Sequence, residues 1–315
     1  MLSNEIYKGD FVHGKRTSNP RHYGVGSPYK WAEKKGPILV KQRKGNDKWR
    51  LIMGSVKLAL LNIKKNFRNE KELKSSFIIS VVGMAINNIA FPILWYYFGK
   101  TIGELNGWKP MDIFGLYGFG TTSYGIVASL FSGMFNIPNY ISSGNFDKYL
   151  LTPKNILLKV STSKISTSAF GDLLFGVVCF IIFAFWNKLT LIQLLLSILL
   201  IIIASIIFYS FSLICMSISF YLMDGHNVSQ GLYGMFLSNS LYHGGAFTGL
   251  LRVIFTFVIP SLLLGAIPVE IVKNLSISNL IMIILLTIFW FILSVMFFYK
   301  SLKKYESNNL FGFGS

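Results

Sequence analysis

The sequence predicts an all-α integral membrane protein with six transmembrane helices. Of its 315 residues, 52% are hydrophobic and only 14% are charged, and the mean hydropathy is +0.53. A soluble domain usually has about a quarter of its residues charged. The apolar residues here also gather in long uncharged runs, and about 20 such residues in a helix cross the hydrocarbon core of a bilayer.

Residues 1–48 are predicted to form a basic cytoplasmic tail. They are rich in glycine, lysine and asparagine and lack the periodicity of an amphipathic helix or strand. The formal net charge of +17 comes mostly from the first 75 residues. A basic segment just before a membrane span attracts anionic headgroups and holds that end in the cytoplasm. We favour this explanation over nucleic-acid binding.

Residues 49–75 are predicted to form an amphipathic helix in the cytoplasmic interface. Apolar residues recur there at intervals of three and four, so they share one helical face, and a row of cations lies about a quarter turn away. A soluble amphipathic helix packed on a partner is the alternative, and the adjoining span favours the membrane. The apolar stripe consists of Trp49, Ile52, Val56, Leu60, Ile63 and Phe67.

Residues 76–304 are predicted to contain the six spans, followed by a C-terminal tail at 305–315. The fourth span is too long to cross vertically, so it tilts or projects beyond the bilayer. The fifth is interrupted by Pro260, and the polar stretch before it is expected to be a loop at the membrane surface. The predicted spans are 76–98, 111–135, 165–186, 191–222, 246–264 and 277–299.

Lysine and arginine near the span ends predict the orientation. The N-terminal region, the 139–164 loop and the residues after 299 are basic, whereas the opposite loops hold few cations. Because basic loops stay in the cytoplasm, both termini and the 139–164 loop are placed there. The expected location is the cell membrane, with multiple passes.

The loop between spans two and three contains a short predicted helix. Ser142 or Ser143 can cap its start. Thr152 and Pro153 end it, because the residue before a proline avoids the helical region. The loop therefore carries a brief helix on the cytoplasmic side.

This short helix has one apolar face. Phe146, Tyr149 and Leu150 are three and four residues apart and share that face, while Asp147 and Lys148 point elsewhere. Such a face fits a groove in a soluble partner. A helix lying on the lipid surface and a plain linker are the alternatives that the residues leave open.

Two stretches resemble the membrane subunits of type-two ABC exporters, in particular bacterial permeases that work with a separate ATPase. They are NIPNYISSGNFDKYLLTPKNILL and LLRVIFTFVIPSLLLGAIPVEIV. The resemblance runs from about residue 49 to residue 304, and its most specific part is Ile-x-x-Gly-x-x-Asp-x-x-Leu-Leu-x-Pro, from Ile141 to Pro153. Residues 1–48 and the stretch 223–245 depart from the family pattern.

The resemblance implies a role for each of these segments. Residues 49–68 would be a connecting helix, residues 143–151 a coupling helix docked on the ATPase, and residues 260–272 an outer-face helical hairpin. The implied ATPase-docking residues are Phe146, Asp147, Tyr149 and Leu150.

The resemblance also implies the activity. The chain would be the permease of an ATP-driven exporter, paired with a second copy or a sister permease. A path rich in apolar and aromatic residues favours a hydrophobic or amphiphilic drug, peptide or lipid-like compound. The alternative from another class is an ATP-independent membrane protein, such as a secondary carrier or an immunity or anchoring factor.

Asp172 is the one acid deep in a predicted span. A charge at mid-membrane costs roughly 2.5–3.5 kcal/mol on insertion scales, so Asp172 is expected to face the protein interior. Structural pairing is preferred over a place on the transport pathway. Arg252, expected near the cytoplasmic start of span five, is one possible partner, although it could instead reach lipid headgroups.

No pattern predicts catalysis, a cofactor or a metal. His226 and His243 lie too far apart in sequence, without a clear third ligand, to indicate a zinc site. The two cysteines lie in apolar runs and suit small buried side chains. The chain has no phosphate-binding loop of the form G-x-x-x-x-G-K-[ST], so ATP hydrolysis is expected in a separate subunit.

Overall fold

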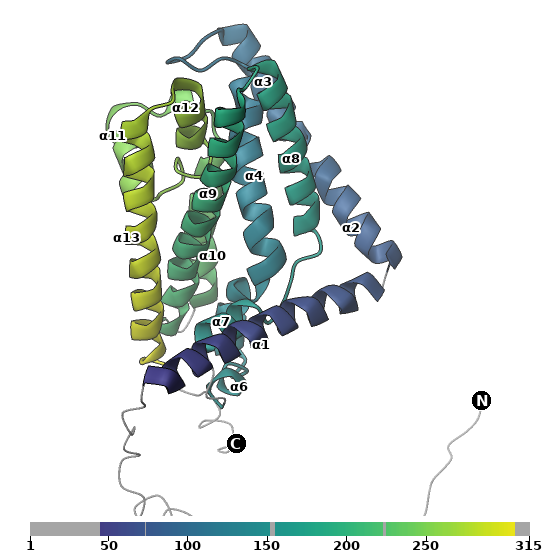
Figure 1. Ribbon diagram of the computed structural model, residues 1–315, viewed down its shortest axis with the longest axis vertical. Helices are drawn as coiled ribbons and strands as arrows, with labels where there is room; N and C mark the ends of the chain where they lie inside the picture. The colour runs from purple at the N-terminus through teal and green to yellow at the C-terminus, as the bar shows by residue number, and fades with distance from the viewer. Residues whose placement is uncertain (1–44, 73, 152–154, 223–224, 306–315) are drawn as a thin grey trace, which may run out of the picture. The chain divides into compact units, whose positions relative to one another are not determined.

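The computed structural model describes residues 45–72, 74–151, 155–222 and 225–305 (Figure 1). Every regular element in these ranges is helical, which confirms the predicted all-α class. In the part of the chain that the structure describes, four helical segments are long and apolar enough to cross a membrane, two fewer than the six spans predicted. They are Lys74–Thr101, Ala169–Trp186, Leu191–Phe220 and Ile277–Leu302.

The longer elements form an upright bundle with α1 lying across one end (Figure 1). We call this the α6 end, because the short helices α5, α6 and α7 lie there, and we call the opposite end the α12 end. The longer helices are α1 (Gly45–Glu72), α2 (Lys74–Asn87), α3 (Ala90–Ile102), α4 (Asp112–Phe131), α8 (Ala169–Trp186), α9 (Leu191–Ser217), α10 (Gly225–Ser240) and α13 (Ile277–Leu302). The shorter ones are η2 (Ser132–Asn136), α5 (Ile137–Ser142), α6 (Asp147–Leu150), α7 (Ile156–Ser161), η3 (Ile218–Phe220), η4 (Gly244–Ala246), α11 (Gly249–Val253), η5 (Ile254–Val258) and α12 (Ala266–Asn274).

The first span is broken between α2 and α3. At the break the amide of Ile89 donates to the carbonyl of Ile86, a tighter contact than the helical ladder, at 3.1 Å. Pro92 follows in the first turn of α3, where its missing N–H costs least. At this break the side chain of Asn88 reaches α8, where it donates to the carboxylate of Asp172.

α4 packs most extensively against α8, through glycines on both helices. A Cβ atom at Gly118 would lie 2.8 Å from the Cα of Phe180, and one at Gly125 would lie 2.6 Å from the backbone nitrogen of Leu173. On the α8 side, a Cβ at Gly176 would lie 2.5 Å from the hydroxyls of α4 threonines. Small residues let helix backbones approach closely in membranes, so this pair forms the centre of the bundle.

α9 and α13 pack side by side, and α9 also contacts α4 and α10. α9 begins with a capping box. The Thr190 hydroxyl accepts from the backbone N–H of Gln193, and the side-chain carbonyl of Gln193 accepts from the backbone N–H of Thr190. With η3 it reaches 30 residues. At 1.5 Å per residue this is about 45 Å, longer than a hydrocarbon core of about 30 Å, as the sequence predicted.

The predicted fifth span at 246–264 is wrong. These residues form η4, α11, the π-helical η5, an extended stretch and a turn that leads into α12. Pro260 explains the break, because it lacks an N–H and drives Ile259 into an extended conformation (φ −118°, ψ 90°). The segment therefore turns back on itself at the α12 end (Figure 1).

The stretch that we expected to be a surface loop contains a helix instead. α10 occupies residues 225–240 and packs on α9 and η3. His226 lies in its first turn, and His243 follows its last turn. A helix of 16 residues is about 24 Å long. The two histidines are therefore too far apart to bind one metal ion.

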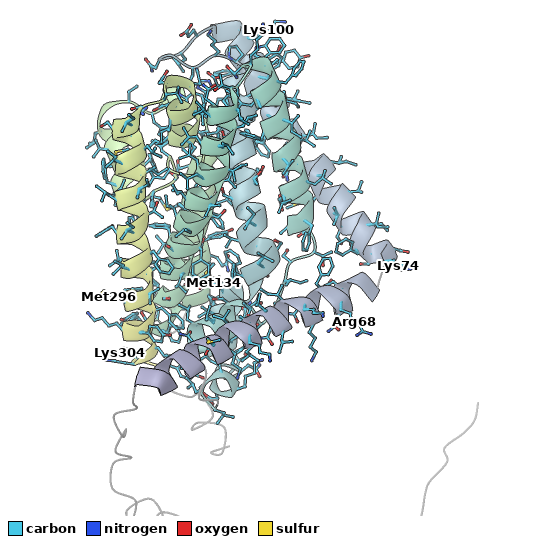
Figure 2. The ribbon with its side chains drawn as sticks, in the orientation of Figure 1. Arg68, Lys74, Lys100, Met134, Met296 and Lys304 are labelled. Carbon is cyan, nitrogen blue, oxygen red and sulfur yellow. The ribbon has the colours of Figure 1, made fainter. Side chains whose placement is uncertain are left out.

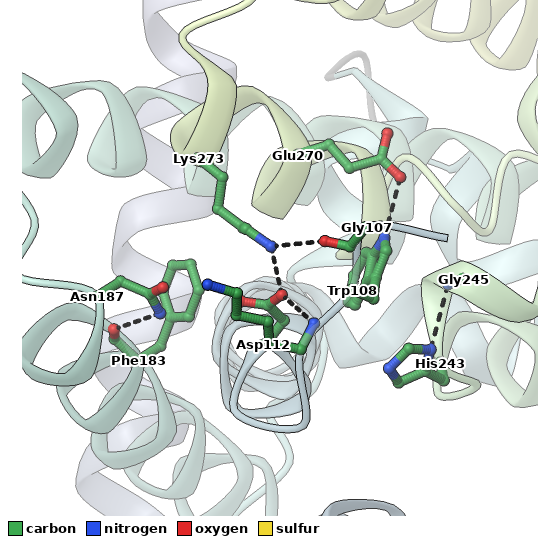
Figure 3. Close-up of polar contacts among 10 residues, drawn as sticks. Gly107, Trp108, Asp112, Phe183, Asn187, His243, Gly245, Glu270 and Lys273 are labelled. Atoms are coloured by element: carbon green, nitrogen blue, oxygen red, sulfur yellow. Dashed lines mark hydrogen bonds and ion pairs between the residues drawn. The ribbon is translucent and has the colours of Figure 1, made fainter. Parts of the chain in front are cut away.

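Polar contacts join the loops at the α12 end (Figure 3). Asp112 is fully buried at the start of α4, where it accepts from the amide of Lys109 and pairs with Lys273 of α12. Lys273 also donates to the carbonyl of Gly107, at 3.0 Å. An acid at a helix N-terminus is stabilised by the helix dipole. This network holds α12 over the end of α4.

We expect Gly125→Val to destabilise the bundle. The added side chain would meet the α8 backbone, and overpacking of this kind costs about 1–3 kcal/mol. Gly120→Val is the matched control, because an added Cβ there has no atom within 4 Å. The melting temperature of each purified variant in detergent is the measurement. Equal melting temperatures for the two variants would contradict the close α4–α8 contact.

Candidate functional site

Three short helices, α5, α6 and α7, form the α6 end of the bundle. The chain turns between α5 and α6 at Gly144, whose φ of +67° favours glycine. The amide of Phe146 donates back to the carbonyl of Tyr140 at 3.0 Å, which closes this turn. The expected serine cap is absent from α6, and the Ser143 hydroxyl donates instead to the carbonyl of Asn139 in α5. Thr152 and Pro153 lie outside the described residues.

The face shared by Phe146 and Tyr149 points into the protein. Phe146 is 0% exposed and Tyr149 is 5% exposed. The Phe146 ring lies 5.2 Å from Phe220 of η3 and 5.1 Å from Tyr305, centroid to centroid. A one-turn helix gains little from its own hydrogen bonds, so it folds only where its aromatic side chains pack. The expectation that these two rings are exposed for docking is therefore wrong.

Asp147 also bonds within the chain. Its carboxylate accepts from the hydroxyl of Tyr305, just beyond α13, at 2.9 Å. Burial, together with this contact to Asp147, raises the pKa of Tyr305 to about 12. The phenol therefore stays protonated and continues to donate at physiological pH. This bond ties α6 to the end of α13.

Two leucines form the exposed part of α6 and its C-cap. Leu150 is 41% exposed and Leu151 is 83% exposed. Of the residues first expected to dock, Leu150 is the one with a well-exposed apolar side chain. Leu151 was overlooked because helical periodicity alone placed it off the apolar face.

Lysines surround the two tyrosine rings of this end. The Lys148 ammonium lies 5.0 Å from the centre of the Tyr140 ring and 5.1 Å from that of Tyr149. Lys159 lies 5.5 Å from the Tyr149 ring, and it donates to the carbonyl of Lys148 at 3.0 Å. Burial and the charge of Lys148 lower the pKa of Lys159. The surface around α6 is thus basic.

α1 is joined to the same end by a polar face. Asn62 and Asn66 donate to the hydroxyl and carbonyl of Thr162, at 3.4 Å and 3.2 Å. Ser55 accepts from the amide of Asn155. The predicted apolar stripe lies on a different face, where Val56 and Leu60 are 45% and 63% exposed. The side chains of Trp49 and Ile52 lie outside the described residues.

Asp172 lies in the first turn of α8 and is 4% exposed. Its Oδ1 accepts from the side-chain amide of Asn88 at 2.6 Å, whereas its Oδ2 is buried without a hydrogen-bond partner among the described residues. Gly171 lets α2 approach, since a Cβ there would lie 2.3 Å from the carbonyl of Val81. Asp172 is thus half paired, by an amide and not by a cation.

A cavity of about 150 Å³ adjoins Asp172. It lies among α2, α3, α4, α8 and α10, and its wall combines hydroxyls with aromatic and aliphatic side chains. The lining residues are Met84, Asn88, Phe91, Tyr117, Gly120, Thr121, Tyr124, Asp172, Leu237, Ser240 and Leu241.

Arg252 is not the partner of Asp172. It pairs with Glu270 of α12, with nitrogen–oxygen distances of 3.1 Å and 2.5 Å. Glu270 also accepts from the indole nitrogen of Trp108, at 3.2 Å (Figure 3). Arg252 was expected at the start of a fifth span, and that part of the expectation is wrong because residues 246–264 fold back on themselves.

Sequence reasoning missed three partners: Asn88 for Asp172, Glu270 for Arg252 and Tyr305 for Asp147. Each is more than 15 residues away, so helical spacing could not pair them. Asn88 did carry a signal, because an amide inside an apolar run needs a hydrogen-bond partner.

Comparison with known proteins gives one match. A family model described as ABC-2 family transporter protein matches residues 83–309. No curated protein and no solved structure matches the chain.

We expect Phe146→Ala to destabilise the α6 end. Deleting a buried aromatic ring costs about 3–5 kcal/mol in well-packed cores. Leu151→Ala, which removes an exposed side chain of the same loop, should leave stability within about 0.5 kcal/mol. Limited proteolysis of the loop and the melting temperature measure both effects. A stable Phe146→Ala variant would show that the ring is not part of the packed core.

Proposed function

The chain belongs to the ABC-2 transporter family, and from this premise we propose that it is the transmembrane permease subunit of an ATP-driven exporter. Family membership is the observation that carries the proposal, and the packed loop at the α6 end supports it. That loop offers a rigid surface at one end of the bundle, as a permease driven by a separate motor requires.

We infer that α4 and α10 complete a set of six spans. α4 has 20 residues, or about 30 Å of helix, and runs beside α8. It is less apolar than α8, α9 and α13, and most of it is enclosed by protein. α10 runs back beside α9. If α10 is the fifth span instead of residues 246–264, the number of spans remains six. The chain then enters and leaves the membrane on the same side.

The distribution of cations supports a cytoplasmic α6 end. Figure 2 shows Arg68, Lys74 and Lys304 at the end that carries α1, and Lys100 at the opposite end. The lysines around Tyr140 and Tyr149 add to the first group. Since basic residues favour the cytoplasmic side, both termini are assigned there and the cell membrane is the proposed location.

We propose that the α6 end docks on an ABC ATPase through Leu150 and Leu151. These are the exposed apolar side chains of α6 and its C-cap, and the surrounding lysines suit an acidic rim on the partner. Phe146 and Tyr149 anchor the loop from inside. The sequence lacks a phosphate-binding loop, so ATP hydrolysis is assigned to the partner.

Two chains of contacts would carry motion from α6 into the bundle. Phe146 packs on Phe220, whose ring lies 6.1 Å from that of Phe298 in α13. Asp147 bonds to Tyr305 at the end of the same helix. A push on α6 therefore reaches η3 and α13 through packed side chains, which resist compression.

A hydrophobic or amphiphilic substrate is favoured. An open groove of about 560 Å³ between α2, α3, α4 and α8 is lined by apolar residues such as Val82, Ile86 and Leu174.

The exposed face of α10 carries Gly231 and Gly234, where an added Cβ would meet no atom within 4 Å. Small residues permit close helix association in membranes, so this face is proposed to meet a second permease copy or a sister permease.

The topology is tested with single cysteines. We expect Glu104→Cys to react with a membrane-impermeant maleimide in intact cells, because residue 104 is exposed at the α12 end. Ser143→Cys and Lys303→Cys should react only after permeabilisation. The native Cys179 and Cys215 are buried and give little background. External labelling at residue 143 would overturn both the orientation and the docking surface.

The docking surface is tested by charge insertion. Changing Leu150 and Leu151 together to aspartate should weaken ATPase binding by thirtyfold or more, since losing interface anchors costs roughly 2 kcal/mol or more. Leu275→Asp, at the opposite end and 50% exposed, is the matched control. Co-purification of the ATPase in mild detergent is the measurement.

Two results would contradict this assignment. Retention of the ATPase by the double aspartate variant would remove Leu150 and Leu151 from the interface. A wild-type chain that brings down no ATPase, yet transports without ATP, would favour a secondary carrier instead.

A further inference from the structure

We propose that the cavity beside Asp172 binds the cationic head of an amphiphile, a protonated amine, with Asp172 as its counter-ion. This inference rests on the proposed function, because it names the chemical class of the exported compound. It is drawn from the half-paired carboxylate, from the composition of the cavity wall and from the place of the cavity in the bundle.

The unpaired oxygen of Asp172 is the first step. One carboxylate oxygen accepts from Asn88 at 2.6 Å, and the other is buried with no partner among the described residues. Buried polar groups are almost always hydrogen-bonded, because an unmade bond leaves the group removed from water without compensation. Asp112 also has one buried oxygen without a partner, but its other oxygen pairs with Lys273. Asp172 has the neutral amide of Asn88 in that place, so its charge is left for a cationic donor from outside the described fold.

Asn88 acts as a positioning residue. It lies at the break between α2 and α3, so its amide reaches α8 while the backbone on either side remains helical. Its single bond fixes the carboxylate without neutralising it. A lysine or arginine at this position would have formed an ion pair and closed the site. The amide instead leaves the negative charge of Asp172 available to a ligand.

The cavity wall suits an organic cation. Tyr117, Tyr124 and Phe91 bring aromatic rings to the wall, and aromatic faces attract ammonium groups. Thr121 and Ser240 add hydroxyls, whereas Met84 and Leu237 are apolar. The volume of about 150 Å³ holds a small head group, and the attached chain would continue along apolar helix faces.

An inorganic cation fits less well. Metal ions such as Ca²⁺ take six to eight oxygen ligands, and Mg²⁺ takes six. This wall supplies one carboxylate, and no group of three or more metal-binding acids, cysteines or histidines occurs in the described part of the chain. An ammonium head needs only one charge partner and an aromatic or hydroxyl surround.

The test is equilibrium binding to the full chain in phosphatidylcholine nanodiscs, with empty nanodiscs as the blank. The probe is radiolabelled dodecylammonium, and dodecanol is its uncharged competitor of equal chain length. We expect saturable binding that excess unlabelled dodecylammonium displaces and that dodecanol, NaCl and KCl do not. Asp172→Asn keeps the shape and the bond to Asn88 but removes the charge. It should weaken binding about tenfold or more.

A second variant does not touch the carboxylate. Gly120 lines the cavity, and an added Cβ there has no atom within 4 Å, so the leucine of Gly120→Leu is expected to occupy part of the cavity. It should also weaken binding about tenfold. Gly83→Leu is the matched control, because Gly83 has equally open space but does not line the cavity. It should bind the probe as the wild type does.

Several results would overturn the inference. They are equal binding by wild type, Asp172→Asn and Gly120→Leu, displacement of the probe by dodecanol, and displacement by Na⁺ or K⁺ alone. ATPase co-purification is measured on the same preparations. A chain that retains its ATPase but shows no Asp172-dependent binding refutes the amine site and leaves the permease assignment standing.

Discussion

The glycine contact between α4 and α8 fixes the positions of the other helices. Because Gly118, Gly125 and Gly176 have no side chains, the two backbones approach closely. A Cβ atom added at any of these glycines would clash with the facing helix. In a bilayer the lipid tails are as apolar as the helices, so packing and not water exclusion holds such a pair together. The remaining helices are arranged around this pair, and α4 is mostly buried as a result.

The two ends of the bundle are stabilised differently. At the α12 end, ion pairs link Asp112 to Lys273 and Glu270 to Arg252, so charged groups join the loops. At the α6 end, stacked aromatic rings and one bond from Tyr305 to Asp147 do the same. Aromatic packing makes a stiff surface, which is consistent with the docking on an ATPase that we propose for this end.

Between these ends, Asp172 differs from the paired charges. Asp112 and Glu270 each have a cation within ion-pair distance, whereas Asp172 has no cation among the described residues and accepts from the amide of Asn88. A lone buried charge is expensive, and a membrane makes it more so. The fold tolerates this cost beside a cavity and not within a packed layer. A ligand that carries the missing positive charge is the simplest physical account of that arrangement.

The sequence by itself determined the helical class, the membrane location and the main apolar runs, because hydrophobicity and helical period are local properties. It also marked Asp172 as an interior charge. Tertiary structure alone decided which face of each short segment is buried. Phe146 and Tyr149 share a face by their spacing, but only the positions of Phe220 and Tyr305 turn that face inward. Likewise, hydropathy placed a span at 246–264, whereas packing on α9 made α10 the long helix and Pro260 folded the next segment back. Contacts between residues far apart in the chain leave no periodic trace, so these outcomes required the folded structure.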